Sequence, residues 1–440
     1  MPISLLQQLR SQADSLGKSV VFRGSAAAFV IKASSTGIAF VLQVLLARWL
    51  GVNDYGEYIY ALTWINLFTL VGQGGFQNAG KKYVSIYKDE SPSLLKGFIL
   101  FSYSTITGMS ILVFLGFLAS TALVQYNMSQ TLLQAIYVGG LMLLFNGLTQ
   151  NTIGILQGYK EIVKGFGPHN ILRPLLIILG VFALFQLTQA DLSAPVTMGV
   201  NAAATFLVLV LTIGFMRKYL PSSFWKVRTN YKSWEWIQVT IPMFLIASLG
   251  FILNRTDILI LGIMLDTSQA GIYAVASRIA SLILFGTFAV NAIVAPIIAK
   301  LYTEGKMGEL QRIIKRSTRG LIAYAIPACI LLLVFGGKFL GLFGSEFVEA
   351  RTALAILTAA NTLTAFFGTV MYIMMMTNNQ NPAAIIMLGI TILNAIMNIV
   401  LIPLFGLVGA ALATGLSTVI WNFSFYIFIR NRLAIDSSPL

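Results

Sequence analysis

The sequence LGVNDYGEYIYA (residues 50–61) joins two apolar stretches, at about 24–47 and 55–76, in which charged residues are rare. A helix needs about 20 mostly apolar residues to cross the hydrocarbon core of a bilayer, so these stretches are predicted to form a membrane-crossing hairpin. The whole chain has this character, because 57% of its 440 residues are hydrophobic and 10% are charged, whereas a soluble domain has about 25% charged residues. We therefore expect an all-α polytopic membrane protein.

Ten further apolar stretches bring the predicted number of transmembrane helices to twelve. A charged, proline-containing segment at 217–236 divides them into two groups of six and is predicted to be a cytoplasmic linker. The predicted organisation is an amphipathic cytoplasmic N-terminus (1–23), an N-lobe of spans 1–6 (24–216), the linker, a C-lobe of spans 7–12 (237–429) and a cytoplasmic tail (430–440). The ten stretches lie at about 97–124, 132–157, 170–187, 194–215, 237–264, 270–299, 318–340, 350–376, 383–402 and 407–429.

The basic residues are distributed unequally between the loops. Loops on the side of both termini carry most of the lysines and arginines, whereas the opposite loops carry only Arg48, Lys338 and Arg351. Because cytoplasmic loops are enriched in Lys and Arg, this imbalance predicts a plasma (inner) membrane protein with both termini in the cytoplasm. It also explains the net charge of +14 without nucleic acid as a partner. One long cytoplasmic loop, 303–319, alternates apolar and basic residues and is expected to be an interfacial amphipathic helix.

A short motif occurs once in each half of the chain. In both copies Leu-Gly is followed by a short acidic loop and then by Gly-x-Tyr-x-x-Ala, about 215 residues apart. The recurrence favours an internal duplication, with two six-span halves related by a pseudo-two-fold axis along the membrane normal. Two such bundles are expected to enclose a central cleft that can open to either side. The motif residues are Leu50, Gly51, Gly56, Tyr58 and Ala61 in the first copy and Leu261, Gly262, Gly271, Tyr273 and Ala276 in the second.

Five ionisable residues fall inside predicted spans, and their net charge is positive: Lys32, Arg173, Arg255, Asp257 and Arg278. Each costs about 2.5–3.5 kcal/mol near a helix centre, so each needs a partner, a water-filled cavity or a route to the interface. Arg173 is predicted near the cytoplasmic start of span 5, where its side chain can snorkel to the lipid headgroups. A position that binds substrate is the alternative.

The single acid and its neighbours suggest a specific pairing. Asp257 and Arg278 lie at similar distances on either side of the turn near Ser268, so they should be level on adjacent antiparallel helices. This placement favours a structural ion pair. Arg255 is two residues from Asp257, and that spacing separates their side chains by roughly 160° around the helix. Arg255 is therefore expected either to face the cleft or to bind a carbonyl elsewhere.

Polar uncharged residues complete the candidate site. Lys32 shares one helical stripe with Thr36 and Gln43, which favours a cavity-lining face. Several asparagines lie deep in spans, Asn254 among them, and they are expected to form interhelical hydrogen bonds worth about 0.6 kcal/mol each or to bind sugar hydroxyls. The candidate substrate-binding residues are therefore Lys32, Gln43, Arg173, Asn254, Arg255 and Arg278.

The sequence lacks the residues that several other kinds of chemistry require. The GKS at 17–19 ends like a nucleotide-binding loop, but Gln12 occupies the position of its first glycine and no strand precedes it. The single histidine, His169, is predicted at the end of a cytoplasmic loop, and the single cysteine, Cys329, lies in an apolar run. Neither a metal site nor a catalytic dyad can be assembled from these. We expect no cofactor and no enzymatic activity.

The segment LGVNDYGEY (50–58) resembles the Leu-Gly-x-x-x-Tyr-Gly-x-Tyr signature of Wzx-type polysaccharide flippases, which share a superfamily with the multidrug and toxin extruders. GFQNAGKKY (75–83) is similar to that family's segment after span 2, and FGLVGAALAT (405–414) to its turn between spans 11 and 12. The resemblance implies outward movement of an undecaprenyl-pyrophosphate-linked oligosaccharide by alternating access, through a cationic lumen that the basic residues above would match. It also implies a polysaccharide polymerase and chain-length proteins as partners.

Three other functions stay open on the sequence. An ion-coupled multidrug or metabolite antiporter of the same fold would use Asp257 as its coupling residue, although many such extruders carry their acid in span 1, where this chain has Lys32. In a membrane scaffold without transport, the charged residues inside spans should all form ion pairs. One acid, Asp257, cannot pair with four basic residues. A flippase for the peptidoglycan precursor would usually have two further spans.

Overall fold

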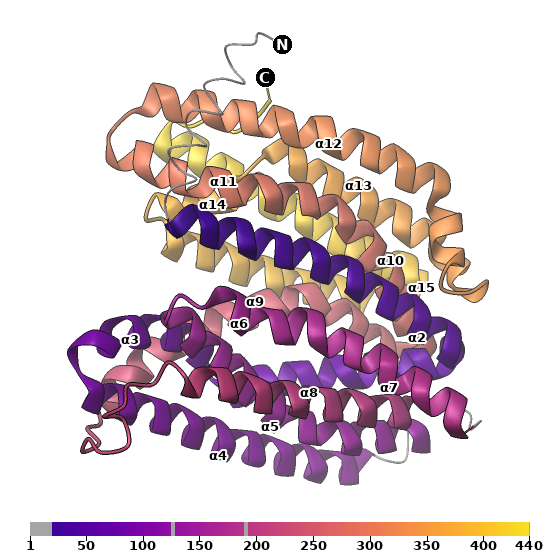
Figure 1. Ribbon diagram of the computed structural model, residues 1–440. Helices are drawn as coiled ribbons and strands as arrows, with labels where there is room; N and C mark the ends of the chain where they lie inside the picture. Colours follow the sequence, from indigo (N-terminus) through magenta and orange to yellow (C-terminus); the bar gives the residue numbers. More distant parts are fainter. Residues whose placement is uncertain (1–19, 125–127, 189–191, 440) are drawn as a thin grey trace.

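The computed structural model describes residues 20–124, 128–188 and 192–439, and all regular secondary structure in these ranges is helical (Figure 1). Nine of the described helices are long and apolar enough to cross a membrane, and a tenth span is bent in its middle. Two of the helices, α2 (Val20–Gln73) and α15 (Gln380–Leu433), each contain a sharp break and two spans. The described chain therefore contains the twelve predicted spans.

Glycines allow the two long helices to break. Gly51 in α2 has φ 70° and ψ 176°, and Gly406 in α15 has φ 57° and ψ −131°. Glycine adopts positive φ at little steric cost. A straight helix of 54 residues would be about 80 Å long, far more than the hydrocarbon core of about 30 Å. In Figure 1 the indigo helix α2 accordingly turns back at its right-hand end.

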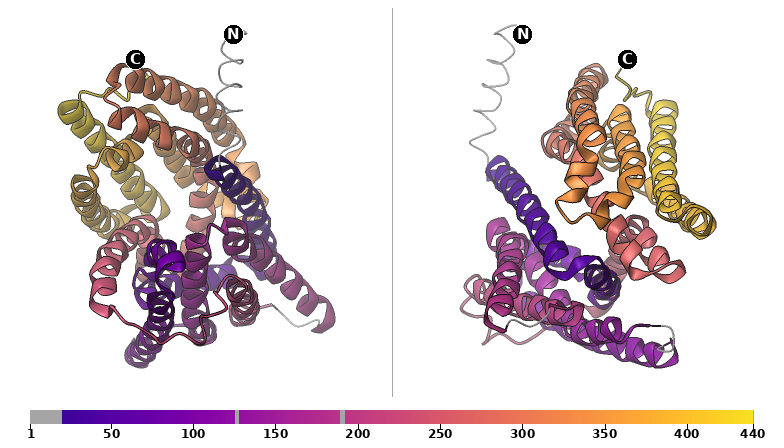
Figure 2. Two further views of the ribbon diagram at one scale, coloured as in Figure 1. Left: turned by 60° about the vertical axis from the view of Figure 1, so that its left-hand side comes forward. Right: turned by 90° about the vertical axis from the view of Figure 1, so that its right-hand side faces the viewer.

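The helices form two bundles, one from each half of the chain, which lie below and above each other in Figure 1 and are seen from two further sides in Figure 2. After α2, the first bundle contains α3 (Phe76–Glu90), α4 (Pro92–Val124), α5 (Gln130–Gly158), α6 (Ile162–Gly167), the π-helical turn η2 (Pro168–Leu172), α7 (Arg173–Thr188) and α8 (Ala194–Arg217). The second contains α9 (Ser233–Met264), α10 (Thr267–Ala280), η3 (Ser281–Ile283), α11 (Leu284–Thr303), α12 (Met307–Gly341), η4 (Glu346–Ala350), α13 (Arg351–Phe367), α14 (Val370–Met376) and α15.

Two local predictions were incomplete or wrong. The helix α3 was not predicted; it begins after Gly75, whose φ is 82°, and buries one face of six residues. The predicted interfacial helix at 303–319 does not lie separately at the surface. Its apolar residues Leu310 and Ile314 are fully buried, and the segment is continuous with the span of α12. Packing of these two side chains inside the protein replaced the predicted contact with lipid.

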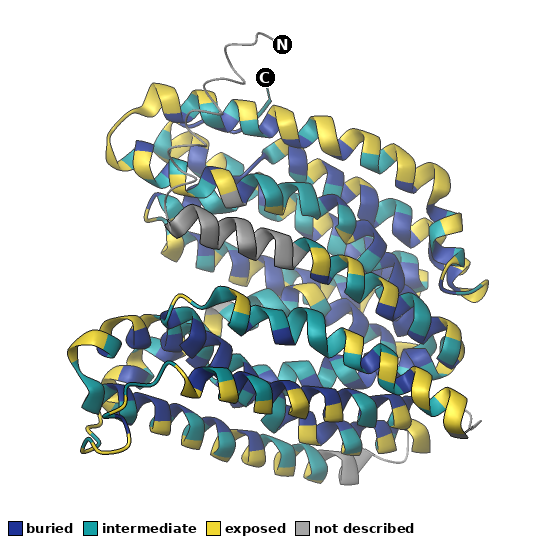
Figure 3. Ribbon diagram, viewed as in Figure 1, coloured by how far each residue is buried: buried dark blue, intermediate teal, exposed yellow. Residues whose placement is uncertain are grey.

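The outward surfaces of both bundles are apolar, as lipid contact requires. Large hydrophobic side chains such as Leu112, Leu179, Val334 and Leu404 are more than 60% exposed, and the buried residues line the inner sides of the helices (Figure 3). Hydrophobic faces of this size would cause aggregation in water, but they are stable in contact with the hydrocarbon core of a membrane. The protein is therefore a multi-pass membrane protein.

The repeated motifs pack directly against each other. A Cβ atom built at Gly56 would lie 2.3 Å from the carbonyl oxygen of Thr267, and one built at Gly271 would lie 2.6 Å from the Cα of Gly56. Only glycine permits such close contact between backbones. The second copy of the motif thus meets the first at equivalent residues, which is the arrangement expected around a pseudo-two-fold axis.

The two bundles share a second equivalence, in the segments that follow their sixth spans. The linker runs back along the start of α4: Asn230 N donates to Ser93 O at 3.2 Å and Lys96 Nζ donates to Val227 O at 3.0 Å. The residues after α15 run back along α12 in the same way. There Thr318 Oγ1 donates to Ser437 O at 3.0 Å, and Arg319 Nε donates to Pro439 O at 2.9 Å. We call these segments, 218–232 and 434–439, the linker brace and the tail brace.

Helix α9 connects the two bundles physically. Its first turns pack on the first bundle, where Tyr83 Oη donates to Glu235 O at 3.2 Å and a Cβ at Gly75 would lie 2.5 Å from Thr240 O. It also packs against α10 and α15 of the second bundle, and Thr414 of α15 donates to Asp257 in its later turns. The helix therefore crosses from one bundle to the other along its length.

Candidate functional site

The two bundles close on each other near the repeated hairpins. Tyr55 and Phe347 make an edge-to-face contact with ring centroids 5.6 Å apart, and Arg48 Nε donates to Leu342 O at 2.6 Å. A ring contact between Phe40 and Phe343, at 5.5 Å, extends the closure. We call this region the hairpin seam; it consists of Phe40, Arg48, Tyr55, Gly56, Gly271, Leu342, Phe343 and Phe347.

Arg173 heads a chain of hydrogen bonds inside the first bundle. Its Nε and Nη2 atoms donate to Asn201 Oδ1 at 3.2 and 2.9 Å, and Asn201 Nδ2 donates to the hydroxyl of Tyr58 at 2.8 Å. Asn201 is 2% exposed and Tyr58 is 1% exposed. The chain links α7, α8 and the motif on α2, so it ties the basic side chain to the repeat.

The predicted snorkelling of Arg173 to the headgroups was wrong. The span that contains Arg173 begins at Ile162, and α6 and η2 precede α7 in it. Arg173 therefore lies well inside the span. His169 belongs to the same turn, where its ring nitrogen Nε2 is 3.0 Å from Gln150 Nε2, so it is not at a loop end as predicted. Such π-turns are frequent at functional sites.

Asp257 and Arg278 do not form the predicted ion pair. Asp257 Oδ2 accepts from Thr414 Oγ1 at 3.3 Å, and its Oδ1 accepts from Ile258 N at 2.8 Å. Arg278 Nη1 instead donates to the carbonyl oxygen of Ala39 at 3.2 Å. Asp257 points toward α15, whereas Arg278 points toward α2. A similar predicted depth in the membrane was therefore not enough to bring the two side chains together.

Arg255 lies near Arg278 at the boundary between the bundles. It is half-buried and forms no ion pair with Asp257, and among the described residues no hydrogen bond satisfies its guanidinium. Tyr55 lies within electrostatic reach of both Arg255 and Arg278, and Tyr58 within reach of Arg173 and Arg278. These two tyrosines thus connect three arginines, Arg173, Arg255 and Arg278, which we call the arginine cluster.

The arginine cluster has no carboxylate partner in the described parts of the chain. The ion pairs formed there join Lys164 to Glu161, Lys232 to Glu235, Lys300 and Lys306 to Glu304, and Lys315 to Asp436. All of them lie at helix ends or in the braces. A charged side chain within a membrane span is expensive unless it is paired or hydrated, so these three arginines must be stabilised by something other than an ion pair with a described carboxylate.

The other predicted site residues have different surroundings. Gln43 is buried, and its Oε1 accepts from the Tyr55 hydroxyl at 2.8 Å, so it holds the hairpin seam and does not line an open surface. Asn254 is exposed and donates to Gly250 O of its own helix at 2.6 Å. Lys32 lies on α2, but its side chain is outside the described residues.

Sequence reasoning missed Asn201, Tyr55 and Tyr58 as members of this site. Both tyrosines belong to the segment LGVNDYGEY, and Tyr58 also to the repeated motif, but these signals were interpreted only as a family resemblance and as evidence of duplication. Asn201 was one of several buried asparagines. Only the packing of α8 against α2 and α7 distinguishes it. Among the described residues no group of three His, Cys, Asp or Glu side chains could hold a metal ion.

The comparison with known families gives a direct result. A family model for polysaccharide biosynthesis proteins matches residues 21–302. The chain belongs to this family. The match includes the hairpin-seam glycines and all three members of the arginine cluster, and it confirms the resemblance predicted from LGVNDYGEY.

Curated relatives of this family member come from archaea and bacteria. It is 25% identical over 407 residues to the "Probable low-salt glycan biosynthesis flippase Agl15" of Haloferax volcanii, a match that covers 90% of this chain and 80% of the relative. It is 24% identical over 329 residues to the "Capsular polysaccharide biosynthesis protein CapF" of Staphylococcus aureus, covering 70% of this chain and 81% of the relative.

Solved structures share the fold of this family member. The inward-facing conformation of a multidrug resistance MATE family transporter has a TM-score of 0.71 at 12% identity, covering 93% of this chain and 98% of that one. The lipid II flippase MurJ, in an inward closed conformation, has a TM-score of 0.68 at 14% identity, covering 91% of this chain and 87% of that one. These likenesses establish the two-lobe fold and do not identify a substrate.

Proposed function

We propose that the protein moves an undecaprenyl-pyrophosphate-linked oligosaccharide from the cytoplasmic to the outer leaflet of the plasma membrane. The observation that carries the proposal is the arginine cluster, which lies among membrane-spanning helices without a carboxylate partner in the described chain. Arginine presents a planar fork of donors that matches phosphate oxygens. The relatives whose names describe flippases agree with a lipid-linked glycan as cargo.

The proposed mechanism is alternating access with both termini in the cytoplasm. In that orientation the hairpin seam faces the outside, and its contacts close the outer side between the lobes. The pyrophosphate and glycan enter from the cytoplasm and meet the arginine cluster, with Lys32 on the adjoining α2, while the lipid tail stays in the bilayer. Rocking of the lobes then breaks the seam and exposes the cargo to the outside.

The charge of the cargo gives the transport step a direction. Moving a negative charge outward across a membrane with an inside-negative potential is favourable by about 2.3 kcal/mol per charge per 100 mV. A pyrophosphate diester carries two negative charges, so the membrane potential assists outward movement. The translocated glycan is then available to a polysaccharide polymerase and chain-length protein, which we expect as partners in the same membrane.

The test is translocation of a fluorescent undecaprenyl-pyrophosphate oligosaccharide in proteoliposomes under an imposed potential. Arg255→Ala should remove most transport without loss of stability, since no hydrogen bond within the described chain depends on its guanidinium. Lys338→Ala removes an exposed cation that does not belong to the cluster and should leave transport unchanged. Equal transport by wild type and Arg255→Ala would exclude Arg255 as a residue that binds the cargo.

One observation supports a second function, an ion-coupled antiporter for drugs or metabolites. Asp257 is 2% exposed and is not neutralised by Arg278, so a buried carboxyl remains that can take up a proton. Under this proposal Asp257→Asn abolishes the response of transport to a pH gradient. If transport of drug-like cations in proteoliposomes is the same in Asp257→Asn and wild type at every gradient, the antiporter function is excluded.

A further inference from the structure

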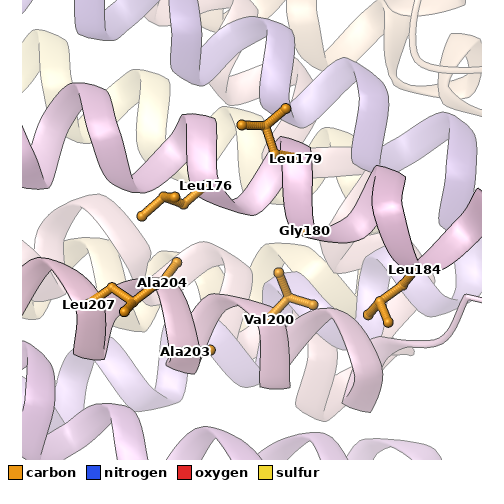
Figure 4. Close-up of a pocket in the computed structure, with 8 residues that line it drawn as sticks. All are labelled: Leu176, Leu179, Gly180, Leu184, Val200, Ala203, Ala204 and Leu207. Atoms are coloured by element: carbon orange, nitrogen blue, oxygen red, sulfur yellow. The ribbon is translucent and has the colours of Figure 1, made fainter. Parts of the chain in front are cut away.

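A groove between α7 and α8 is lined only by apolar residues. Its volume is about 440 Å³, and Figure 4 shows side chains from both helices along its two sides. Gly180 brings the helices close together here, because a Cβ at that position would lie 2.7 Å from Val200 Cγ1. The lining residues are Leu176, Leu179, Gly180 and Leu184 on α7 and Val200, Ala203, Ala204 and Leu207 on α8.

The groove opens to the hydrocarbon core of the membrane. Leu179 is 62% exposed and Leu207 is 53% exposed, although both lie within membrane spans. Water is not a suitable occupant, because an apolar groove offers it no hydrogen-bond partner. The surface therefore takes a flexible hydrocarbon chain.

One member of the arginine cluster lies at the end of this groove. On α7 the residues Arg173, Leu176, Gly180 and Leu184 are spaced by three or four positions, so they share one face of the helix. The hydrogen-bond partner of Arg173 is Asn201, which directly follows the lining residue Val200 on α8. Arg173 thus lies one turn before the groove on α7, and its partner Asn201 lies beside the groove on α8.

Arg173 retains the capacity to bind an anion. Two of its N–H groups bind Asn201 Oδ1, out of the five that a guanidinium carries. No carboxylate pairs with it among the residues that the structure describes. An amphiphile with a phosphate head and a long apolar chain fits both features, with its head at Arg173 and its chain along the groove.

We propose that the α7–α8 groove holds the phosphate-proximal part of the polyprenyl chain of the lipid-linked cargo, with the diphosphate on Arg173. This inference rests on the proposed function and adds a seat for the part of the cargo that stays in the bilayer. Charge complementarity distinguishes the occupant: a bulk phospholipid acyl chain fills the groove without any need for Arg173, whereas a polyprenyl diphosphate binds more tightly when Arg173 is present.

The test uses the full chain in nanodiscs of phosphatidylethanolamine and phosphatidylglycerol. The probe is undecaprenyl diphosphate with a photoreactive diazirine in the isoprene units next to the phosphate, and cross-linked peptides are mapped by mass spectrometry. We expect adducts to concentrate on residues 176–184 and 200–207. Ala203→Trp, which fills an exposed part of the groove, should lower the yield about tenfold, equivalent to about 1.4 kcal/mol of binding.

A matched control and a competition experiment make the outcome decisive. Val210→Trp adds the same side chain at an exposed position of α8 outside the groove and should not change the yield. Arg173→Gln should raise the half-saturating probe concentration about tenfold, and unlabelled undecaprenyl diphosphate should compete better than undecaprenol. Equal competition by the two, or adducts spread evenly over all lipid-facing helices, would overturn the inference in favour of bulk lipid.

The cross-linking and flipping experiments together distinguish failure of this inference from failure of the proposed function. Flipping of the fluorescent glycan by wild type, with no concentration of adducts at the groove, would reject the groove and leave the flippase function intact. Adducts at the groove that depend on Arg173, without flipping of any glycan tested, would support a polyprenyl diphosphate site and reject the flippase function.

Discussion

The two copies of the repeated motif have kept their packing and changed their chemistry. Gly56 and Gly271 touch each other at the hairpin seam, but the tyrosines that follow them have different neighbours. Tyr58 accepts a hydrogen bond in the chain that leads to Arg173, whereas Tyr273 is buried beside Asp257. A contact between backbones needs only glycine, so it survives duplication, while the surrounding side chains are free to diverge. The result is a tyrosine linked to a basic side chain in the first copy and a tyrosine beside a carboxyl group in the second.

The largest expected effect comes from breaking the feature that the copies share. In Gly56→Ala the new Cβ would overlap the carbonyl oxygen of Thr267 and the Cα of Ser268, both backbone atoms that cannot rotate away. We expect a loss of about 2–3 kcal/mol of stability and a shift of the protein toward an open hairpin seam. Thermal unfolding in nanodiscs measures the first effect, and labelling of a cysteine placed at Phe347 measures the second.

Gly108→Ala is the matched control for this change. Gly108 is also helical, and a Cβ there would meet nothing within 4 Å. Its replacement should leave unfolding and seam labelling unchanged. If Gly56→Ala behaves like Gly108→Ala, the close contact of the repeats does not hold the seam.

Removal of the basic group from the first copy should have the next largest effect. Arg173→Ala leaves the buried Oδ1 of Asn201 without its two donated bonds. Hydrogen bonds to charged groups contribute about 1.5–3 kcal/mol, and relief of a buried charge offsets part of this, so we expect a net loss of about 1.5 kcal/mol. Reversible unfolding in mixed micelles measures it. An unchanged midpoint would show that the bonds to Asn201 contribute nothing.

A matched pair of tyrosine substitutions tests the difference between the copies directly. Tyr58→Phe removes the acceptor of Asn201 Nδ2 and should cost about 0.6 kcal/mol, the average for interhelical hydrogen bonds in membrane proteins. Tyr273→Phe leaves the chain from Arg173 to Tyr58 intact and changes only the surroundings of Asp257, beside which the Tyr273 hydroxyl is buried, so its cost should differ from that of Tyr58→Phe. The same unfolding measurement compares the two. Equal losses would mean that both copies have equivalent polar networks.

The smallest expected effect is a difference between the two braces in how their docking depends on pH. Burial raises the pKa of Asp436, but hydrogen bonds from Ser438 and the charge of Lys315 lower it below its ordinary value of 3.8 overall. A lowered carboxyl pKa stabilises docking of the tail brace above pH 3.8, and this contribution is lost as the pH falls through the lowered pKa. The backbone contacts of the linker brace on α4 involve Lys96 and no acid.

Limited proteolysis at pH 7 and near pH 3 therefore separates the braces. We expect residues 434–439 to become accessible at the lower pH in wild type and already at pH 7 in Asp436→Asn, while residues 225–230 stay protected in both. Simultaneous release of both braces at low pH would indicate general unfolding instead of a local titration.

The spans and the repeat could be predicted because their signals are local. Apolar length is enough to define a span, and the breaks at Gly51 and Gly406 coincide with predicted turns. The start of span 5 was misplaced because Lys164, Pro168 and His169 make that segment resemble a loop. The structure makes it helical, and this moves Arg173 inward.

Only the positive charge of the candidate site could be predicted from the sequence. Basic residues inside spans identified Arg173, Arg255 and Arg278, but sequence spacing fixes depth along a helix and not the direction of a side chain relative to neighbouring helices. For that reason the expected pairing of Asp257 with Arg278 was wrong. The contact of Asn201 with Arg173 depends on how α7 and α8 pack, which no local pattern specifies.

The path of α9 has a consequence for local motion. The helix packs on the first bundle where Gly75 approaches Thr240 and Phe244, and on the second bundle at Asp257, and Pro242 lies within the first of these contacts. A proline inside a helix removes one backbone hydrogen bond, so bending is easiest there. We expect the amides just after Pro242 to exchange with deuterium faster than those in the rest of α9, and to slow when a ligand holds the bundles in one arrangement.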